Sequence, residues 1–460
     1  MDHHEPSNFV KARSSVVWIL AILVAFSLVW WIESTSRANL IDAGSGSGGA
    51  RAGRAEIATS ADLPPLPSPR ALTPQELEWA RTAWAYFEAE ADPATGLVGS
   101  VQGHGGATLW DIGSQVLATV AARELGLVPQ REFDARVQRM LYALQRLPLH
   151  AGALPNKSYD VRSLAMTDYA NRPVPEGVGW SALDVGRGVI ALVTLAWRAP
   201  EHAGAVREVL ARWDLSQLVR EGDLIGRAAG DNGHAAQLVQ EGRLGYEQYA
   251  ARGAALVALT PDRALDWQRN LRLVEVQGVQ LPVDVRDPAQ FGAQNFIVSD
   301  PFVMAGLELG WDRLGREFAW RVLRAQEARF RQTSVPTAVT EDHIDRAPWF
   351  LYNSVFSGGQ PWATVTEDGT AHPELRTLSV KAAFGWHALF RTAYTQRLVE
   401  EVAALHEPGK GWYAGRYEQD QVPNRAITTN TNAVVLESLA YIAAGPLLRF
   451  DTPARMKGSR

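Results

Sequence analysis

Apolar residues recur with helical spacing along most of the chain after Thr73. Some segments keep one polar face, as EFDARVQRMLYALQRL at 132–147 does, and these fit an outer layer. Others are rich in small residues and apolar almost all round, which is typical of helices buried on both sides. The latter segments are 114–126, 186–197, 250–259, 380–390 and 432–445. About ten to twelve helical segments of these two kinds alternate along the chain.

Helix starts and one repeat indicate how these segments are organised. Thr73, Thr108 and Ser181 are each followed three residues later by an acid, which is the capping-box pattern, and Asp300-Pro301 reads as an N-cap followed by proline. DIGSQVLAT at Asp111 and DVGRGVIAL at Asp184 repeat the same pattern. We predict an all-α fold, an (α/α)6-type toroid of helical hairpins with minor β elements, with an α-solenoid as the rival. The clearest β candidate is 274–285, a hairpin around Gly278.

The N-terminal part has a different composition. Val16 to Ile32 is an uninterrupted apolar run, long enough to cover most of a bilayer core of roughly 30 Å. We therefore predict one N-terminal transmembrane helix, with a cleaved signal peptide as the alternative. The predicted parts are a cytoplasmic tail (1–15), a signal anchor (16–32), a Gly/Ser- then Pro-rich linker (33–72), the toroid (73–449) and a tail (450–460). The expected location is the bacterial inner membrane, with the toroid in the periplasm.

Composition excludes several classes of function. The net charge is −5 and there is no run of basic residues, so nucleic acid is not an expected partner. There is no cysteine, which excludes disulfides and thiolate zinc sites. The sequence holds no HExxH, P-loop or GxSxG motif, and we expect no cofactor and no metal. The expected partners are a polysaccharide or oligosaccharide and, through residues 16–32, the lipid bilayer.

The densest group of functional side chains is EGRLGYEQYAARG at 241–253. Carboxylates beside aromatic rings are typical of carbohydrate sites, where rings stack on sugars and acids transfer protons. In a toroid, the loops at one rim and the N-termini of inner helices would form such a site. The candidate catalytic acids are Glu241, Glu341, Glu247, Asp111 and Asp184. The candidate substrate-binding residues are Trp110, Trp180, Arg243, Tyr246, Tyr249, Asp342, Trp349, Trp362, Trp412 and Asn430.

Two of these acids suit opposite roles. Glu341 is next to Asp342, and a neighbouring carboxylate raises a pKa, which suits a general acid. Glu241 is close to Arg243, which would keep a carboxylate ionised and suits a base. Asp111 and Asp184 can instead serve only as first-turn acids of helices. Glu308 and Glu437 fall inside helices, where we expect buried structural partners of an arginine or a backbone group.

Several motifs carry a resemblance to a known family. They are PNKSYD (155–160), GWSALDVGR (179–187), SDPFVMAGLELGWD (299–312), AVTED (338–342), TLSVKAAFGW (377–386) and NTNAVVLESLAY (430–441). Together with 241–253, they resemble the bacterial family called domain of unknown function 3131, from about Thr73 to Gly445. That family is similar in helical layout to the six-hairpin toroid glycosidases. Asp300 and Phe302 stand where the family pattern is expected to hold Glu and Tyr.

The sequence thus favours a membrane-anchored periplasmic glycoside hydrolase that acts on an envelope or exported polysaccharide through paired carboxylates. A non-catalytic glycan-binding or assembly component of an exopolysaccharide system is the alternative. A polysaccharide lyase would need a base such as Tyr246 or Tyr249.

Overall fold

The computed structural model describes residues 56–229, 236–291 and 293–449. The apolar run at 16–32 and the tail at 450–460 lie outside these residues. In the described part, no helix combines the length and apolar character needed to cross a bilayer.

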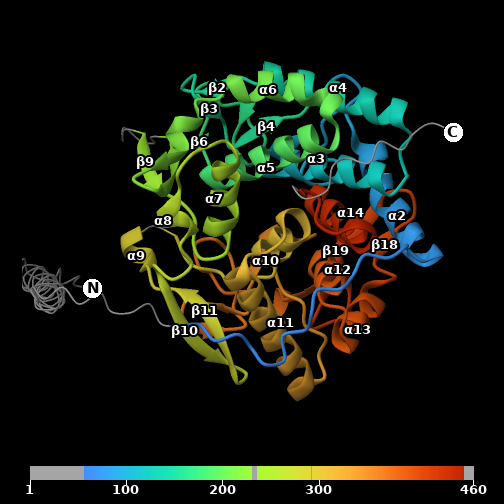
Figure 1. Ribbon diagram of the computed structural model, residues 1–460, viewed down its shortest axis with the longest axis vertical. Coiled ribbons are helices and arrows are strands. Elements are labelled where there is room, and N and C mark those ends of the chain that lie inside the picture. Colours follow the sequence, from blue (N-terminus) through green and yellow to red (C-terminus); the bar gives the residue numbers. More distant parts are fainter. Residues whose placement is uncertain (1–55, 230–235, 292, 450–460) are drawn as a thin grey trace, which may run out of the picture. The chain divides into compact units, whose positions relative to one another are not determined.

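Six helices form an inner ring within residues 57–449 (Figure 1). In ring order they are α3 (Leu109–Glu124), α5 (Ala182–Arg198), α7 (Tyr246–Leu256), α10 (Asp300–Met304) with the π-helical turn η3 (Ala305–Leu309), α12 (Val380–Leu389) and α14 (Thr429–Ala444). Helix α14 packs against α3 and closes the ring. Side chains of α7 form hydrogen bonds with η3 and with Gly310, and these bonds connect α7 to the next member of the ring, α10 with η3.

Each inner helix has an outer partner in the described part of the chain. These partners are α4 (Gln130–Arg146), α6 (Ala203–Ala211), the short α8 (Asp262–Leu265), α11 (Arg313–Thr333), α13 (Ala393–Val402) and α2 (Pro74–Glu90). Helix α2 packs on α14, so the first described helix completes the last hairpin. The described residues therefore form the predicted six-hairpin toroid.

Close contact between inner helices explains why they are rich in small residues. A Cβ atom on Gly186 of α5 would lie 2.8 Å from the Cβ of Ala250 in α7. A Cβ on Gly253 of α7 would lie 2.3 Å from the carbonyl oxygen of Gly186. Glycine at both positions lets the two backbones touch, and any larger residue would force them apart.

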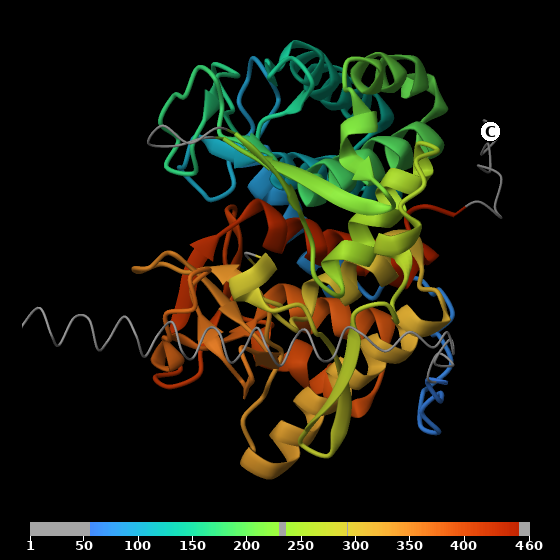
Figure 2. The ribbon, with the colours of Figure 1, turned by 90° about the vertical axis from the view of Figure 1, so that its left-hand side faces the viewer.

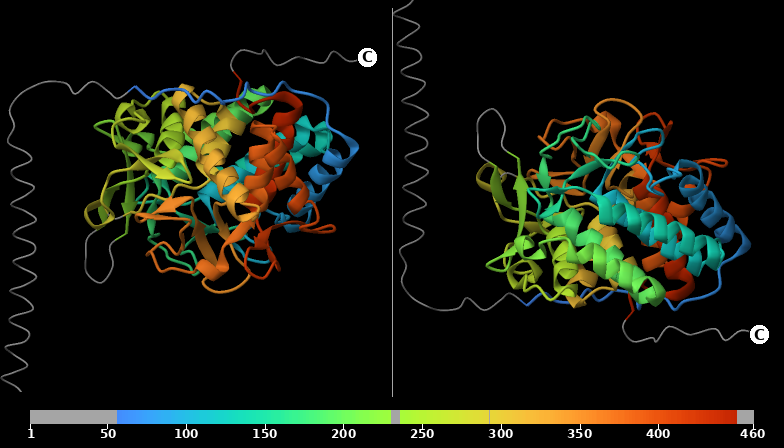
Figure 3. Two further views of the ribbon diagram at one scale, coloured as in Figure 1. Left: turned by 90° about the horizontal axis from the view of Figure 1, so that it is seen from below. Right: turned by 90° about the horizontal axis from the view of Figure 1, so that it is seen from above.

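Two kinds of connection alternate around the ring. Short turns lead from an inner helix to its outer partner, as residues 125–129 and 390–392 do. Long loops lead from an outer helix to the next inner helix, and these carry the strands. The strand-bearing loops gather at one end of the ring, and residues 57–72 run across the other end (Figures 2 and 3).

The strands pair into small antiparallel sheets. The strands in the loops before α3, α5 and α7 are β1 (Gly106–Thr108), β2 (Leu149–His150), β3 (Leu154–Pro155), β4 (Ser158–Asp160), β5 (Met166–Thr167), β6 (Gly179–Trp180), β7 (Val219–Arg220), β8 (Asp223–Ala228) and β9 (Gln237–Gln240). The later ones are β10 (Leu271–Val276), β11 (Val279–Asp284), β12 (Glu341–His343), β13 (Phe350–Asn353), β14 (Phe356–Ser357), β15 (Gln360–Pro361), β16 (Thr364–Val365), β17 (Thr377–Ser379), β18 (His406–Glu407), β19 (Gly411–Tyr417) and β20 (Pro423–Ile427). The hairpin predicted around Gly278 is β10 and β11, and its turn has Gly278 at φ +75°.

Residues 57–72, which we expected to be linker, lie against the toroid. The side chain of Ser60 donates to Glu317 of α11 at 2.7 Å, and the indole of Trp320 donates to Asp62 at 3.0 Å. Near the end of this segment, the backbone N–H of Arg70 donates to the carbonyl of Ile442 at 2.9 Å. These contacts place the start of the compact unit at Ile57, ahead of the expected Thr73.

Candidate active site at the strand-bearing rim

The N-termini of α3 and α5 place two acids at the rim that carries the strands. Thr108 caps α3 by accepting from the N–H of Asp111, and Ser181 caps α5 by accepting from the N–H of Asp184. Asp111 also accepts from the N–H of Thr108 at 3.1 Å and from the hydroxyl of Ser100 at 2.5 Å. The carboxylate of Asp111 is thus occupied by hydrogen bonds at the start of α3, which is the structural role that the sequence offered as an alternative to catalysis.

Asp184 is in a different electrostatic setting. Burial raises the pKa of Asp184 to about 8, and the negative charges of Glu241 and Asp111 add to the rise. Lys157 and a hydrogen bond with Ser181 act in the opposite direction. Asp184 therefore holds its proton at pH 7, which is the state that a general acid requires.

Glu241 supports the helix that carries Asp184. It follows β9, and its carboxylate accepts from the backbone N–H of Ala182 at the start of α5. Burial raises the pKa of Glu241, against hydrogen bonds from Ser181 and Ala182. Our expectation that Arg243 keeps Glu241 ionised is wrong, since the Arg243 guanidinium donates to the side chain of Gln240 and to backbone carbonyls, among them Ala293.

Glu341 and Asp342 lie side by side on β12. Burial raises the pKa of Glu341 to about 7 and that of Asp342 to about 8, while the charge of Lys381 lowers both. Lys381 Nζ lies 3.6 Å from Asp342 Oδ1 and donates to Asp300 Oδ2 at 2.6 Å. Neutral forms of buried acids are favoured because an ionised carboxylate loses its hydration. The raised pKa of Glu341 is caused by burial, whereas we expected the neighbouring carboxylate to cause it; it is the pKa of Asp342 that the charge of its neighbour raises.

Tyr352 connects the two groups of acids. It lies on β13 directly opposite Glu341 of β12. Burial raises the pKa of Tyr352, and the negative charges of Glu341, Glu367 and Asp184 raise it further. Asp184 from the start of α5 and Glu341 from β12 therefore both act on the same tyrosine. We call Asp184, Glu241, Glu341 and Asp342 the rim cluster.

His343 gives a second connection across this rim. Burial lowers the pKa of His343 to about 4, and the positive charges of Lys381 and His104 lower it further. The negative charge of Asp111 acts in the opposite direction. Asp111 of α3 and Lys381 of α12 therefore both influence the pKa of His343, whose imidazole is neutral at pH 7.

Several aromatic candidates need correction. Trp180 is 1% exposed and its indole donates to the carbonyl of Ile225, and Trp412 is fully buried beneath α2, where it donates to Trp79. Neither can stack on a sugar. Trp362 is partly buried under the guanidinium of Arg329. Trp349 is 62% exposed, but no described contact joins it to the rim cluster.

Tyr249 and Glu247 are also interior residues. The Tyr249 hydroxyl donates to Glu308 at 2.5 Å, and the same carboxylate accepts from Arg187 at 2.6 Å inside the ring. Arg187 also lies 3.6 Å from Glu437, so the expected arginine partner of Glu308 and Glu437 is Arg187. Burial of Tyr249 removes one of the two candidate bases for a lyase.

Glu247 is 2% exposed and forms an ion pair with Arg286 at 2.6 Å. It therefore stabilises the start of α7 instead of lining the rim, and Arg243 is likewise buried. Trp110 and Tyr246 remain partly exposed and meet edge to face at 5.6 Å. Asn430 donates to Asp300 Oδ2 at 3.2 Å, so its amide supports the Lys381 contact.

Sequence reasoning missed four residues of this site: Lys381, Tyr352, His343 and Tyr169. Tyr169 is 64% exposed, and the charges of Asp184 and Glu241 reach its hydroxyl. An aromatic in the polar loop DYANRP was the available signal for Tyr169. A lysine in an apolar helix was the signal for Lys381, because such a charge requires buried acids as partners.

Among the described residues, one group has ligand atoms close enough for a metal ion. Asp134, Glu201 and His202 have such atoms within 4.8 Å of one another. Asp134 is on α4, Glu201 and His202 lie in the 3-10 turn just ahead of α6, and Nε2 of His202 is hydrogen-bonded to the carboxylate of Asp134 at 2.8 Å. This group has no part in the rim cluster.

Comparison with solved structures identifies the fold. An endo-β-1,2-glucanase from Chitinophaga pinensis, solved with sophorotriose and glucose, has a TM-score of 0.59 at 13% identity, covering 82% of this chain and 94% of its own. A glucoamylase-like protein from Bacteroides caccae has a TM-score of 0.57 at 13% identity, with 81% and 94% covered. An endo-β-1,2-glucanase from Talaromyces funiculosus, solved with sophorose, has a TM-score of 0.54 at 10% identity, with 82% and 86% covered. The chain shares the (α/α)6 toroid of these glycosidases.

No curated protein sequence matches this chain. One family does, over residues 78–445, and its description is "Protein of unknown function (DUF3131)". The match covers most of the toroid, and the chain belongs to this family.

Proposed function

We propose that the chain is a glycoside hydrolase in which Asp184 is the general acid and Glu341 is its partner base. The observation that carries the proposal is Tyr352, which lies directly opposite Glu341 in the β12–β13 pairing and whose pKa is raised by the negative charges of both Glu341 and Asp184. Two carboxyl groups on opposite sides of one site can protonate a leaving oxygen and activate a water molecule. The shared fold with glycan hydrolases supports the same reaction class.

The pKa values support this division of roles. Asp184, with a pKa of about 8, carries the proton at neutral pH, and Glu341, with a pKa of about 7, is partly ionised there. Asp342 is less suited to the base because it faces Lys381 at 3.6 Å and is only 3% exposed. Asp342 and Lys381 form a buried pair of opposite charges beside Glu341.

The proposed substrate class is a β-linked glucan, with β-1,2-glucan as the first polymer to test. Two structural neighbours are named for that activity. At this rim, Trp110, Tyr246 and Tyr169 offer partly exposed rings for sugar faces. The proposed substrates also include other envelope or exported polysaccharides.

The experiment measures new reducing ends from a panel of bacterial polysaccharides. Asp184→Asn and Glu341→Gln each remove one ionisable group with little change in volume. Each variant is expected to lose at least ~100-fold in kcat/KM, the usual size of a general acid or base contribution. Glu88→Gln, at an exposed position on the outer face of α2, is the matched control and keeps full activity.

Wild-type activity in both variants overturns the assignment. A wild-type chain that binds the glycan without cleaving it favours the alternative, a non-catalytic glycan-binding component. The exposed ring of Tyr169, beside Asp184 and Glu241, is the observation that favours this alternative.

We also propose that the enzyme is tethered to the inner membrane of a bacterium by residues 16–32, with the toroid in the periplasm. The support is the apolar run itself, followed by the Gly/Ser-rich stretch that ends ahead of Ile57. A periplasm-dependent reporter fused after residue 460 should be active. Activity of a cytoplasm-dependent reporter at that position contradicts the proposal.

A further inference from the structure

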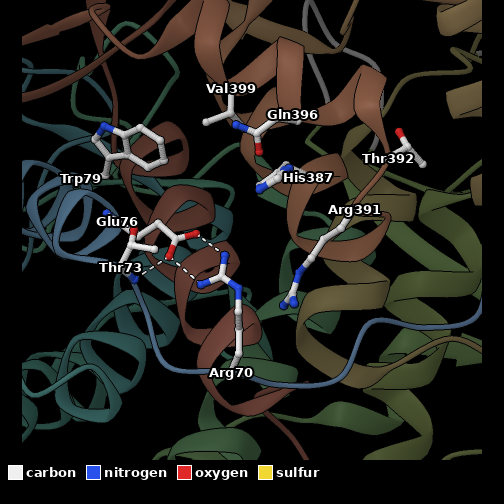
Figure 4. Close-up of a pocket in the computed structure, with 9 residues that line it drawn as sticks. All are labelled: Arg70, Thr73, Glu76, Trp79, His387, Arg391, Thr392, Gln396 and Val399. Atoms are coloured by element: carbon white, nitrogen blue, oxygen red, sulfur yellow. Dashed lines mark hydrogen bonds and ion pairs between the residues drawn. The ribbon is translucent and has the colours of Figure 1, made fainter.

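A cavity of about 330 Å³ lies at the end of the ring opposite the rim cluster. Its walls are the start of α2, the end of α12 and the start of α13 (Figure 4). Helix α12 begins beside Lys381 at the rim cluster and ends at this cavity, so the two places lie at opposite ends of one inner helix. The volume is at the lower end of the range for sites that hold small organic molecules.

The cavity carries a positive charge that is not neutralised. Arg70 forms a double hydrogen bond with Glu76 at 2.6 and 2.7 Å, which balances one charge of each sign. Arg391 donates through Nη1 to the carbonyl of Ser68 at 3.2 Å. Its buried Nε and Nη2 atoms have no hydrogen-bond partner within the described residues. Buried donors of this kind are costly unless something accepts from them.

His387 adds a second unsatisfied group on the same wall. The residue is only 8% exposed, and Nδ1 has no partner in the part of the chain that the structure describes. Figure 4 shows the imidazole beside Arg391, turned toward the space that Trp79 closes from the other side. Burial lowers the pKa of His387 to about 4, and the charges of Arg391 and Arg70 lower it further against that of Glu76. The imidazole is therefore a neutral hydrogen-bonding group in a positive field.

We propose that this cavity binds a small organic anion through a carboxylate or phosphate group. Arg391 and His387 would hold the oxyanion, and the N–H groups at the start of α13 would add to the positive field. The half-buried ring of Trp79 would pack against the body of the ligand. This site is separate from the proposed active site.

The test is titration calorimetry of the full chain carrying Asp184→Asn, so that binding is measured without turnover. Glucuronate, inorganic phosphate and glucose are the probes. Glucuronate or phosphate should bind in a saturable way, and glucose at least 10-fold more weakly. Whichever anion binds more tightly identifies the group that the cavity recognises. Equal binding of glucose, or no saturable binding of either anion, overturns the proposal.

Variants locate the binding. Arg391→Gln should weaken anion binding at least 10-fold, and Arg391→Lys should weaken it less. Arg397→Gln, on the exposed side of α13, is the matched control and should leave binding unchanged. Gln396→Glu adds a negative charge at an exposed position of the cavity wall, so it should weaken binding without disturbing the fold. Unchanged binding in Gln396→Glu and in Arg391→Gln overturns the proposal, and Gln396→Glu decides alone if Arg391→Gln does not fold.

Discussion

Glu241 and Asp184 meet at the N-terminus of helix α5, one as a hydrogen-bond acceptor for its first backbone N–H and the other as a first-turn acid. The charge of Glu241 raises the pKa of Asp184. A carboxylate that sequence reasoning placed as a catalytic base therefore acts on the proposed acid instead. This relationship has a measurable consequence for the pH profile.

Glu241→Gln should shift the alkaline limb of the pH profile of kcat/KM to lower pH. Without the charge of Glu241, the pKa of Asp184 falls, so Asp184 loses its proton at a lower pH. The glutamine oxygen can still accept from Ala182, so we expect a stability loss of only about 1 kcal/mol. An alkaline limb in the same place as in the wild type would contradict the coupling.

Turnover by the wild type should follow a narrow bell between about pH 7 and pH 8. Activity needs Glu341 ionised and Asp184 protonated. Below pH 7, Glu341 takes up a proton, and above pH 8 Asp184 loses one, so both sides fall. The check is kcat/KM on a cleaved glycan from pH 5 to pH 10, and a flat profile over that range is incompatible with the assigned pair.

Asp184→Asn should stabilise the protein at pH 8. The pKa of Asp184 is raised in the folded state, so the folded chain binds more protons than the unfolded chain between about pH 4 and pH 8. The stability contribution of Asp184 therefore declines as pH rises through that window. We expect a gain of about 1 to 3 kcal/mol in the free energy of unfolding at pH 8, and a smaller gain at pH 5. A loss at pH 8 would show that the carboxyl is needed for folding.

The toroid was predictable because its determinants are local. The caps at Thr73, Thr108 and Ser181 are read from three or four neighbouring residues, and all three accept the expected hydrogen bond. The all-round apolar character of the inner helices follows from their position between the outer layer and the ring centre. Local patterns therefore predicted the number and layering of the hairpins.

The site was predictable only in part, because its partners are far apart in sequence. Lys381 meets Asp300 and Asp342 across 81 and 39 residues, and no local pattern shows such pairing. Trp180 and Trp412 stand beside glycine, as loop residues do, but each lies on a strand and its ring is buried in the core. Sequence placed the acids near helix starts, and only the fold showed which of them are used as caps.

Arg187→Met should destabilise the toroid strongly. Arg187 is fully buried and donates to Glu308 at 2.6 Å, so its loss leaves a buried carboxylate without its cation. We expect a loss of about 3 to 5 kcal/mol in the free energy of unfolding. Arg397→Met, which removes an exposed arginine paired with Glu401, should change it by less than about 1 kcal/mol. Denaturant unfolding of both variants makes the comparison, and equal midpoints would contradict the structural role.

Residues 57–72 should behave as part of the folded toroid. Limited proteolysis of the full chain is expected to leave a stable core that begins near Ile57, because Ser60 and Asp62 are bonded to α11 and a protease needs an unfolded backbone. A fragment of residues 73–449 should unfold at a lower denaturant concentration than one of residues 57–449. Glu317 is 0% exposed, and its buried carboxylate accepts hydrogen bonds from Ser60 and Arg321. Removing residues 57–72 takes away the bonds from Ser60 and leaves the one from Arg321, which lowers the stability of the shorter fragment. Ser60→Ala in the longer fragment should reproduce part of that loss, about 1 kcal/mol. Equal stability of the two fragments would mean that the segment only rests on the toroid and that the domain starts at Thr73.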